Sequence, residues 1–293
     1  MFQFIEAHRE QYPIAPMCQM LRVSRSGYYA WRGRPPSARE RENGRLLAEL
    51  QRLHRESRGT YGSPRMHREL LARGWRCGRH RVARLMRRKG IEGKSRRKYH
   101  GTTRAVAARP VAPDRIQRDF SAERPNQKWV GDITQIATRE GWLYLAITLD
   151  LYSRRVIGWS MAEHMREDLV LQALQMAIER RPVVGMLIHH SDRGGQYTSG
   201  AFQALLGKEG ILPSMGSTGD CYDNAVAESF FATLKCECVQ GHVFATRRAA
   251  RTAIFDYIET FYNRWRRHST LGYVSPVAFE TQFEIHAVSY TLN

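Results

Sequence analysis

Three acidic residues stand at positions where a carboxylate could do chemistry. Asp132 lies in the middle of a β-rich run, flanked by Val130 and Ile133, where a carboxylate is costly to bury unless a cation compensates it. Asp192 directly follows a second apolar run and precedes a glycine-rich loop. Glu228 lies on a predicted helix further along the chain. Distant in sequence, the three acids could meet only through the fold.

Carboxylates that converge in this way repel one another, and their hard oxygen atoms suit Mg²⁺ or Mn²⁺. Two such ions can activate an attacking oxygen and stabilise a leaving oxygen on the two sides of a phosphorus atom. No covalent enzyme intermediate is then required. Taken singly, each acid is as readily a helix cap or a hydrogen-bonded buried carboxylate. The hypothesis therefore depends on their joint placement.

The segment that carries these acids is predicted to form a mixed sheet covered by helices, an α/β fold. Three consecutive antiparallel strands are predicted at 129–137, 142–149 and 156–161. After them we expect a helix that ends before Pro182, a strand at 183–190, a helix at 201–209, a strand at 211–215 and a helix at 223–239. This order puts Asp192 at the carboxyl end of a strand, where open α/β sheets usually carry their sites.

The last of these helices has two distinct faces. Val226, Phe230 and Leu234 fall opposite Glu228 on the helical wheel. Lys235 follows Glu228 by seven residues, about two turns, and so shares its face. An ordinary exposed lysine would have the same position.

The positive charge of the chain is concentrated in its first part. The formal net charge is +18, and residues 1–118 hold 29 Lys and Arg against 9 Asp and Glu, whereas residues 119–293 hold 17 against 19. Such a concentrated field indicates a polyanion partner, although a merely solvated basic face would have the same composition. A hydrophobic content of 42% excludes global disorder. With no apolar run near the roughly 20 residues of a membrane span and no signal peptide, we expect a cytoplasmic protein.

The basic part is predicted to be helical throughout. Residues 1–36 resemble a helix-turn-helix segment of short helices, and residues 37–92 form a helical DNA-binding region with a second helix-turn-helix. In this region Ser37 caps a long helix that reaches Glu56, and Ser63 caps the next helix with Pro64 at its first position. Residues 93–125 are a basic linker that can follow a phosphate backbone.

A recognition helix is predicted from Arg79 to Lys89. Val82, Leu85 and Met86 provide its packing stripe. Cations that can reach DNA occupy its other faces and the start of the linker: Arg79, Arg81, Arg84, Arg87, Arg88, Lys89, Arg96, Arg97 and Lys98.

The five cysteines are Cys18, Cys77, Cys221, Cys236 and Cys238. They are scattered and contain no pair spaced for a zinc site, which indicates reduced thiols rather than a disulfide framework.

The motifs around the acids resemble a known family. Asp132 lies in Trp-Val-Gly-Asp-Ile-Thr, Asp192 in His-His-Ser-Asp-Arg-Gly-Gly-Gln-Tyr and Glu228 in Asp-Asn-Ala-Val-Ala-Glu-Ser-Phe-Phe. These motifs, with 59 residues between the aspartates and 35 between Asp192 and Glu228, closely resemble those of DDE transposases and retroviral-type integrases. The tail at 262–276 is similar to the end of the core in the insertion-sequence 3 family, in its second-frame product, OrfB. The resemblance covers about residues 58–285.

The resemblance implies an RNase H-like fold, with an integrase catalytic core at 126–245 and a C-terminal helical extension at 246–293. It implies two Mg²⁺ ions, replaceable by Mn²⁺, on Asp132, Asp192 and Glu228, and a DNA transposase that cleaves and joins strands at element ends. It also implies that Lys235 contacts end DNA. Matches at Gln196, Tyr197 and Asn224 make these residues candidates to support the acids. Three neighbouring acids are interpreted as structural: Asp150, Asp220 and Asp223.

The expected partners are double-stranded DNA, comprising terminal inverted repeats and target DNA, and further copies of the chain, because joining two ends requires two end complexes. A first-frame partner, OrfA, often fused by frameshifting, is also implied, and the expected location is the bacterial cytoplasm at the nucleoid. The chain departs from the family pattern at residues 217–219, where it has Ser-Thr-Gly and relatives have a more basic segment. This loop is therefore expected to hold DNA less strongly.

Three other functions fit part of the sequence. A binding-only protein with a degenerate catalytic fold is disfavoured because the three acids and Lys235 are all present. A nuclease acting on RNA–DNA hybrids is disfavoured because an arginine-rich helix suits the major groove of duplex DNA. A tyrosine recombinase is suggested by His190, Arg193 and Tyr222, but the acidic motif explains Asp192, which lies within that triplet.

Overall fold

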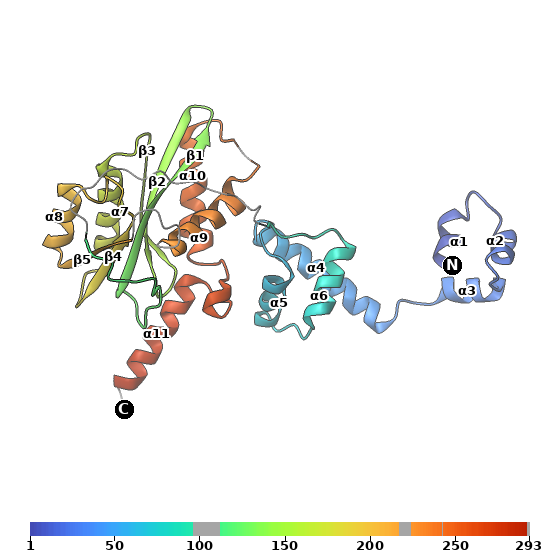
Figure 1. Ribbon diagram of the computed structural model, residues 1–293. Coiled ribbons are helices and arrows are strands. Elements are labelled where there is room, and N and C mark those ends of the chain that lie inside the picture. The colour runs from blue at the N-terminus through green and yellow to red at the C-terminus, as the bar shows by residue number, and fades with distance from the viewer. Residues whose placement is uncertain (96–111, 217–223, 242, 292–293) are drawn as a thin grey trace.

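The computed structural model describes residues 1–95, 112–216, 224–241 and 243–291. Figure 1 shows a helical N-terminal part, then a sheet flanked by helices, then a C-terminal helix that leaves the sheet domain. The predicted architecture, a mixed sheet flanked by helices and preceded by an all-helical region, is confirmed. In the part of the chain that the model describes, no helix combines the length and apolar character needed to cross a bilayer.

The sheet has five strands in the order β3-β2-β1-β4-β5. The strands are β1 (Lys128–Thr138), β2 (Gly141–Asp150), β3 (Val156–Ala162), β4 (Leu187–Ser191) and β5 (Ile211–Met215). The first three pair antiparallel, and β4 and β5 run parallel to β1. The prediction of a strand from 183 is wrong at its start. Val184 and Met186 are exposed and Gly185 has a φ of +77°, so this apolar run is a turn that leads into β4.

Helices cover both faces of the sheet. The helices are α7 (Glu167–Arg180) and α8 (Gly200–Lys208) on one face, and α9 (Ala225–Leu234) and α10 (Arg247–Asp256) on the other (Figure 1). Alternation along β1 divides its side chains between them, because Trp129 belongs to the α7–α8 core and Val130 to the α9–α10 core. Gly158 allows β3 to approach α7, since a Cβ there would lie 2.1 Å from the carbonyl oxygen of Ala173.

Two of these helices end in a wider turn. The π-helix η1 (Lys235–Val239) continues α9, and the π-helix η2 (Tyr257–Tyr262) continues α10. The predicted helix at 223–239 is therefore α9 followed by η1. A short 3₁₀ turn, η3 (Ser269–Leu271), and helix α11 (Pro276–Thr291) complete the chain.

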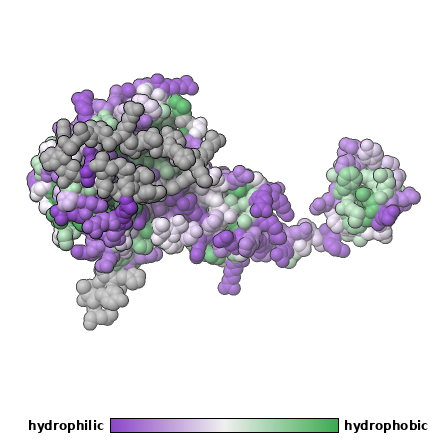
Figure 2. All heavy atoms as spheres, viewed as in Figure 1, coloured by the Kyte–Doolittle hydropathy of each residue, from purple (hydrophilic) through white to green (hydrophobic). Residues whose placement is uncertain are grey.

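The N-terminal part consists of two helical units. The first contains α1 (Phe2–His8), α2 (Ile14–Met20) and α3 (Arg25–Gly33), packed on a small core of its own. Apolar side chains also gather on its surface (Figure 2). The second contains α4 (Ala38–Glu56), α5 (Ser63–Ala72) and α6 (Arg79–Arg88).

The helix starts of the second unit test two predicted caps. The cap at Ser37 is confirmed, because its side chain and that of Glu40 form a reciprocal capping box. The cap at Ser63 is wrong: Gly62 is the N-cap, and Ser63 is the first helical residue with no side-chain cap. Pro64 takes the position after Ser63, where a missing N–H costs nothing.

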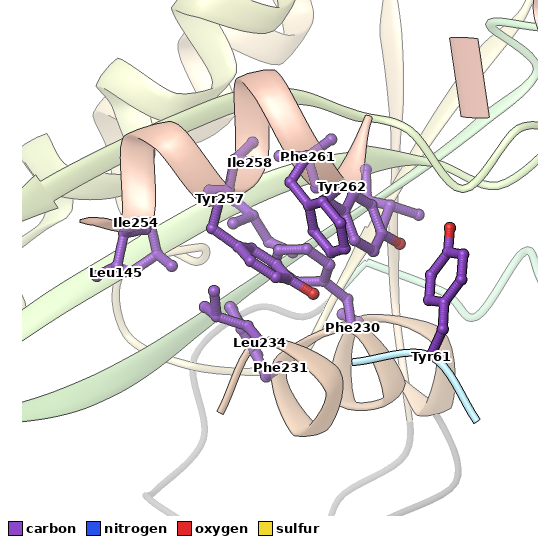
Figure 3. Close-up of a cluster of buried hydrophobic side chains, with 14 of the residues drawn as sticks. Tyr61, Leu145, Phe230, Phe231, Leu234, Ile254, Tyr257, Ile258, Phe261 and Tyr262 are labelled. Atoms are coloured by element: carbon purple, nitrogen blue, oxygen red, sulfur yellow. The ribbon is translucent and has the colours of Figure 1, made fainter. Parts of the chain in front are cut away.

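The α4–α6 unit shares its hydrophobic core with the α9–α10 face of the sheet. This core includes Leu50 and Leu85 from the unit together with Val130, Phe230 and Tyr262 from the sheet domain. Figure 3 shows Tyr61, from the segment before α5, beside the aromatic rings of this cluster.

Candidate active site

Asp132 occupies the strand position that the sequence predicts for it. On β1 it alternates with Gly131 and so projects to the face of Val130, which is covered by α9. Its Oδ1 accepts a hydrogen bond of 2.7 Å from the Ile133 N–H. Burial raises the pKa of Asp132 well above its ordinary value, and the negative charges of Asp192 and Glu228 raise it further, against the opposing charge of Lys235.

Asp192 is brought beside Asp132 by strand pairing. Val130 pairs with His190 at the end of the parallel ladder between β1 and β4, so Asp132 and Asp192, two positions further along, lie beside each other where β4 ends and β1 continues. Asp192 Oδ1 accepts a 2.9 Å hydrogen bond from the Gly194 N–H. Desolvation by the surrounding protein raises the pKa of Asp192, and this hydrogen bond partly offsets the rise.

Glu228 lies in the first turn of α9 and is exposed. The opposite helix face is buried at Phe230 and Leu234, as the helical wheel predicts. Partial burial raises the pKa of Glu228. The prediction that Glu228 faces the aspartate site is supported by its effect on the pKa of Asp132.

The three acids interact, but they do not close into a compact cluster. Among the described residues, no three acidic, histidine or cysteine side chains lie close enough to hold one metal ion. Like charges repel, which keeps the carboxylates of Asp132, Asp192 and Glu228 apart. Their chemistry nevertheless fits a hard divalent cation, since all three donors are carboxylates and Asp132 is left with two like-charged neighbours.

Lys235 lies at the junction of α9 and η1, on the exposed face that it shares with Glu228. Burial of its stem lowers the pKa of Lys235, and attraction to Asp132 acts in the opposite direction. The ammonium group therefore lies within electrostatic reach of Asp132.

Gly131 is a junction behind the acids. A Cβ on this glycine would lie 2.8 Å from the His189 ring and 3.2 Å from the Tyr197 ring, so only glycine fits. The Asn224 side chain donates a 3.0 Å hydrogen bond to the Gly131 carbonyl oxygen. Asn224 is also the N-cap of α9, and its carbonyl accepts from the Glu228 N–H at 3.1 Å. Asn224 thus joins the helix of Glu228 to the strand of Asp132.

Among the described residues, three polar atoms at this junction lack partners. The Tyr197 hydroxyl, the Asn224 Oδ1 and the His189 Nδ1 are buried without a hydrogen bond. Burial raises the pKa of Tyr197 well above its ordinary value, and the charges of Asp132 and Asp192 add to the rise, so the phenol is neutral. The third predicted supporting residue, Gln196, instead donates a 2.8 Å hydrogen bond to the Met165 carbonyl oxygen.

The predicted recognition helix has the expected inner face, with Val82, Leu85 and Met86 buried. It ends at Arg88, one residue earlier than predicted. The cations Arg79, Arg84, Arg87, Arg88 and Lys89 are exposed. Arg81 instead makes contacts inside the protein: its guanidinium pairs with Glu42 at 3.0 Å and donates a 2.8 Å hydrogen bond to Asn43.

Some predicted residues lie outside the described part of the chain. These are Arg96, Arg97, Lys98, Cys221, Tyr222, Asp220, Asp223 and the 217–219 loop. Asp150 is buried and accepts hydrogen bonds from the backbone of Asn126 and Tyr152, consistent with a structural acid. The other four cysteines are free thiols.

The sequence analysis missed a buried ion pair two residues beyond Lys235. Glu237 accepts two 2.7 Å hydrogen bonds from Arg266, and both side chains are buried. The only signal in the sequence was a charged residue among apolar neighbours on a helix, Cys236 and Cys238.

Three family models match the chain. The integrase core domain matches residues 122–221, a second integrase core domain model matches residues 228–283, and an HTH-like domain matches residues 40–99. The first match contains Asp132 and Asp192, and the second begins at Glu228. The third match lies over α4–α6.

Curated relatives match over almost the whole chain. The transposase InsF for insertion sequence IS3A of Escherichia coli (strain K12) is 45% identical over 96% of this chain and 98% of its own length. A 31 kDa protein of insertion element IS600 from Shigella sonnei is 44% identical over 91% of this chain and 98% of its own length. Among solved structures, the catalytic core domain of HTLV-2 integrase in complex with magnesium is 17% identical, with a TM-score of 0.39, over 54% of this chain and 98% of that chain.

Proposed function

The chain belongs to the insertion-sequence 3 transposases with an integrase core, and from this premise we propose that Asp132, Asp192 and Glu228 are its catalytic carboxylates. Membership makes the protein a DDE polynucleotidyl transferase that catalyses DNA transposition, with an HTH-like region for binding DNA. The observation that supports the assignment of residues is the pairing of β1 with β4, which places Asp132 beside Asp192, together with the hydrogen bond from Asn224, at the start of the helix of Glu228, to Gly131. The raised pKa of Asp132, to which Asp192 and Glu228 contribute, agrees with this placement.

We propose that the three carboxylates hold two Mg²⁺ ions, for which Mn²⁺ can substitute. Carboxylate oxygens are the ligands that these cations prefer. Such a pair, when bound, supplies charge for both the attacking and the leaving oxygen of a phosphodiester. The hydrogen bonds from Ile133 to Asp132 and from Gly194 to Asp192 orient the two carboxylates that would hold the cations.

The proposed reaction is an in-line displacement at phosphorus. A water molecule cleaves the element end, and the resulting 3′-hydroxyl then attacks a target phosphodiester, whose bond to the opposite oxygen breaks. Lys235 binds a backbone phosphate of the end DNA beside the acids, as its exposed position and its interaction with Asp132 support. Asn224 and Tyr197 act as positioning residues, because both pack on Gly131 next to Asp132.

The test of the carboxylate assignment is Asp192→Asn. We expect the variant to bind a duplex that carries the element end but to lose cleavage and joining with Mg²⁺ and with Mn²⁺. Glu179→Gln, an exposed acid at the far end of α7, is the matched control and should keep both activities. Undiminished strand transfer by Asp192→Asn would contradict the assignment.

The same assay separates the other functions. A binding-only protein would leave duplex DNA uncut even as wild type, and a hybrid nuclease would cut RNA–DNA hybrids in preference to duplex DNA. A tyrosine recombinase would form a covalent adduct with the DNA end.

We propose further that the chain assembles as a homo-oligomer on DNA, acts with a first-frame partner, OrfA, and works in the bacterial cytoplasm at the nucleoid. Two ends must be held together for joining, which supports the assembly. The DNA that flanks the gene tests the partner most simply: short inverted repeats and an overlapping upstream frame should be present. Their absence would leave this chain to act without a first-frame product.

A further inference from the structure

The α4–α6 unit is attached to the catalytic core through a defined docking surface. This surface is formed by η1 and the segment after η2, and its contacting residues are Glu237, Trp265, Arg266, Arg267 and Tyr273. None of these residues belongs to the acid site, but η1 begins at Lys235 and directly continues the helix of Glu228.

Tyr61 is the central contact. Its side chain is buried, and its ring stacks on Trp265 with centroids 5.1 Å apart. Its hydroxyl accepts a 2.7 Å hydrogen bond from the Arg267 N–H and donates a 3.2 Å hydrogen bond to the Trp265 carbonyl oxygen. Figure 3 shows Tyr61 next to the rings of Phe230 and Tyr262. A tyrosine held by stacking and by two hydrogen bonds fixes orientation as well as distance.

Charged side chains of α5 hold the unit at the same surface. Glu69 accepts a 2.5 Å hydrogen bond from Arg267 Nε. Arg65 lies 3.7 Å from the buried carboxylate of Glu237, and Arg68 lies over the Tyr273 ring at 5.2 Å.

Glu237 links this docking surface to the active-site helix. Its carboxylate accepts from Arg266 and from the Tyr257 hydroxyl at 2.8 Å, while its carbonyl oxygen accepts a 2.6 Å hydrogen bond from Lys94 Nζ. Within the helical unit, α6 is bound to α4 through Arg81, as described above, and through the shared core. A continuous set of contacts therefore runs from the recognition helix, through the shared core and the docking surface, to the helix of Glu228.

We propose that α4–α6 and the catalytic core of one protomer act as a rigid ruler, in which the docking surface sets the distance from the DNA sequence that α6 reads to the phosphodiester that is cut. This inference rests on the proposed function. Successive phosphates of a strand lie about 3.4 Å apart along the helix axis, so selecting one phosphodiester requires the two parts to keep their relation within about that distance. A flexible tether cannot do so, whereas a stacked, ion-paired and desolvated contact can.

The test maps the cut on a labelled duplex that carries the element end, at nucleotide resolution. The double variant Arg65→Met with Glu69→Gln removes the two α5 charges that pair with Glu237 and Arg267 across the docking surface. We expect its cuts to spread to phosphodiesters one or two positions on either side of the wild-type site. The matched control, Arg52→Met with Glu56→Gln, removes two charges that pair inside the helical unit, with each other and, for Glu56, with Arg73, and should cut at the wild-type position alone.

A merely structural role would lower the yield of cleavage without moving its position. Cuts confined to the wild-type phosphodiester in both docking variants, the double variant and Tyr61→Phe, would overturn the ruler. Tyr61→Phe keeps the stacked ring and loses only the two hydrogen bonds, so it serves as the test on its own if the double variant does not fold. In that case a cut that stays in place also overturns the ruler.

A second measurement needs no variant. One or two base pairs are inserted between the sequence that the wild-type protein protects and the phosphodiester that it cuts. The ruler predicts a cut at the original distance from the protected sequence, and a cut that moves with the element terminus would contradict it. Failure of the proposed function is distinguishable, because the wild-type chain would then show no cleavage dependent on a divalent cation.

Discussion

Two sites in this protein place a carboxylate in opposite electrostatic surroundings: Glu237 lies among hydrogen-bond donors, and Asp132 lies near two other acids. At Glu237, both carboxylate oxygens accept hydrogen bonds from Arg266, and Tyr257 adds a third. At Asp132, one backbone N–H is the hydrogen-bonded neighbour and two further acids face the same carboxylate. Removal from water costs both groups free energy, but only Glu237 is compensated by the fold. The comparison therefore distinguishes Glu237, which stabilises the fold, from Asp132, which we propose binds a cation.

A third acid follows the pattern of Glu237. Glu280, on α11, pairs with Arg181 at 2.6 Å and with Arg155 at 2.7 Å and is buried. Burial alone would raise the pKa of Glu280, but the hydrogen bonds and charge of Arg181, with help from Ser153 and Arg155, hold it below its ordinary value. Burial also raises the pKa of Asp150, but there backbone hydrogen bonds and the charge of Arg181 oppose the rise. Asp132 differs in that two further acids, Asp192 and Glu228, raise its pKa still more.

The largest difference between the clusters is expected in activity. Asp132→Asn should lower strand transfer by on the order of 10³-fold or more, because a bound cation contributes several kcal/mol to the transition state. It should not lower stability in the absence of metal, since it removes one of three repelling charges. Kinetics and chemical denaturation in a chelator measure the two effects. A destabilised, active variant would reverse the assignment.

The opposite outcome is expected at the paired cluster. Glu237→Ala leaves the Arg266 guanidinium buried without its carboxylate and should lower the free energy of unfolding by about 3–5 kcal/mol. Urea denaturation checks this value. The control is Glu163→Ala, which removes an acid that pairs with Arg247 at the surface and should cost under about 1 kcal/mol. Equal losses in the two variants would mean that the Glu237 cluster contributes no more than a surface pair.

The pH dependence of stability should also have opposite signs. The lowered pKa of Glu280 contributes stability above its unfolded value, near 4.5, which is lost as the pH falls through the folded pKa. The raised pKa of Asp132 means that the folded chain holds its proton more tightly, so stability falls as the pH rises from 3.8 through the folded pKa. Denaturation of Glu280→Gln and Asp132→Asn across this range should show slopes that change in opposite directions. If both substitutions changed the pH slope of stability in the same direction, the proposed difference between Glu280 and Asp132 would be contradicted.

The smallest effect concerns the recognition helix. Exposed Arg84 should contact a phosphate, so Arg84→Ala should lower the slope of log affinity against log salt by about one unit. Arg81→Ala breaks contacts to Glu42 and Asn43 and should leave that slope nearly unchanged while lowering stability. Binding of duplex DNA at several salt concentrations distinguishes them, and equal slopes for the two variants would place Arg84 off the interface.

Local patterns predicted much of this protein. Strand and helix patterns predicted that Asp132 lies within a strand, that Asp192 directly follows a buried strand and that Glu228 lies on a helix opposite its apolar face. The helix cap at Ser37 followed from a side-chain pattern three residues long.

The predictions were wrong or incomplete where contacts with distant parts of the chain, rather than the local sequence, determine the structure. The apolar run before β4 resembles a strand, but its glycine has a positive φ and its large side chains are exposed. Arg81 resembles its exposed neighbours on the helical wheel, but in the fold it pairs with Glu42 of α4. The docking surface joins Tyr61 to Trp265 and Arg267, more than 200 residues away, and no periodicity or motif reports such a contact.

The central claim, that Asp132, Asp192 and Glu228 bind a divalent cation, is tested most directly by thermal unfolding of the DNA-free protein against Mn²⁺ concentration. Wild type should gain stability with the logarithm of the concentration, reaching about 2.7 kcal/mol at a hundredfold excess over the dissociation constant. Asp192→Asn should gain little, and Glu179→Gln should match wild type. A rise in Asp192→Asn equal to that of wild type would show that the cation binds elsewhere and would contradict the account.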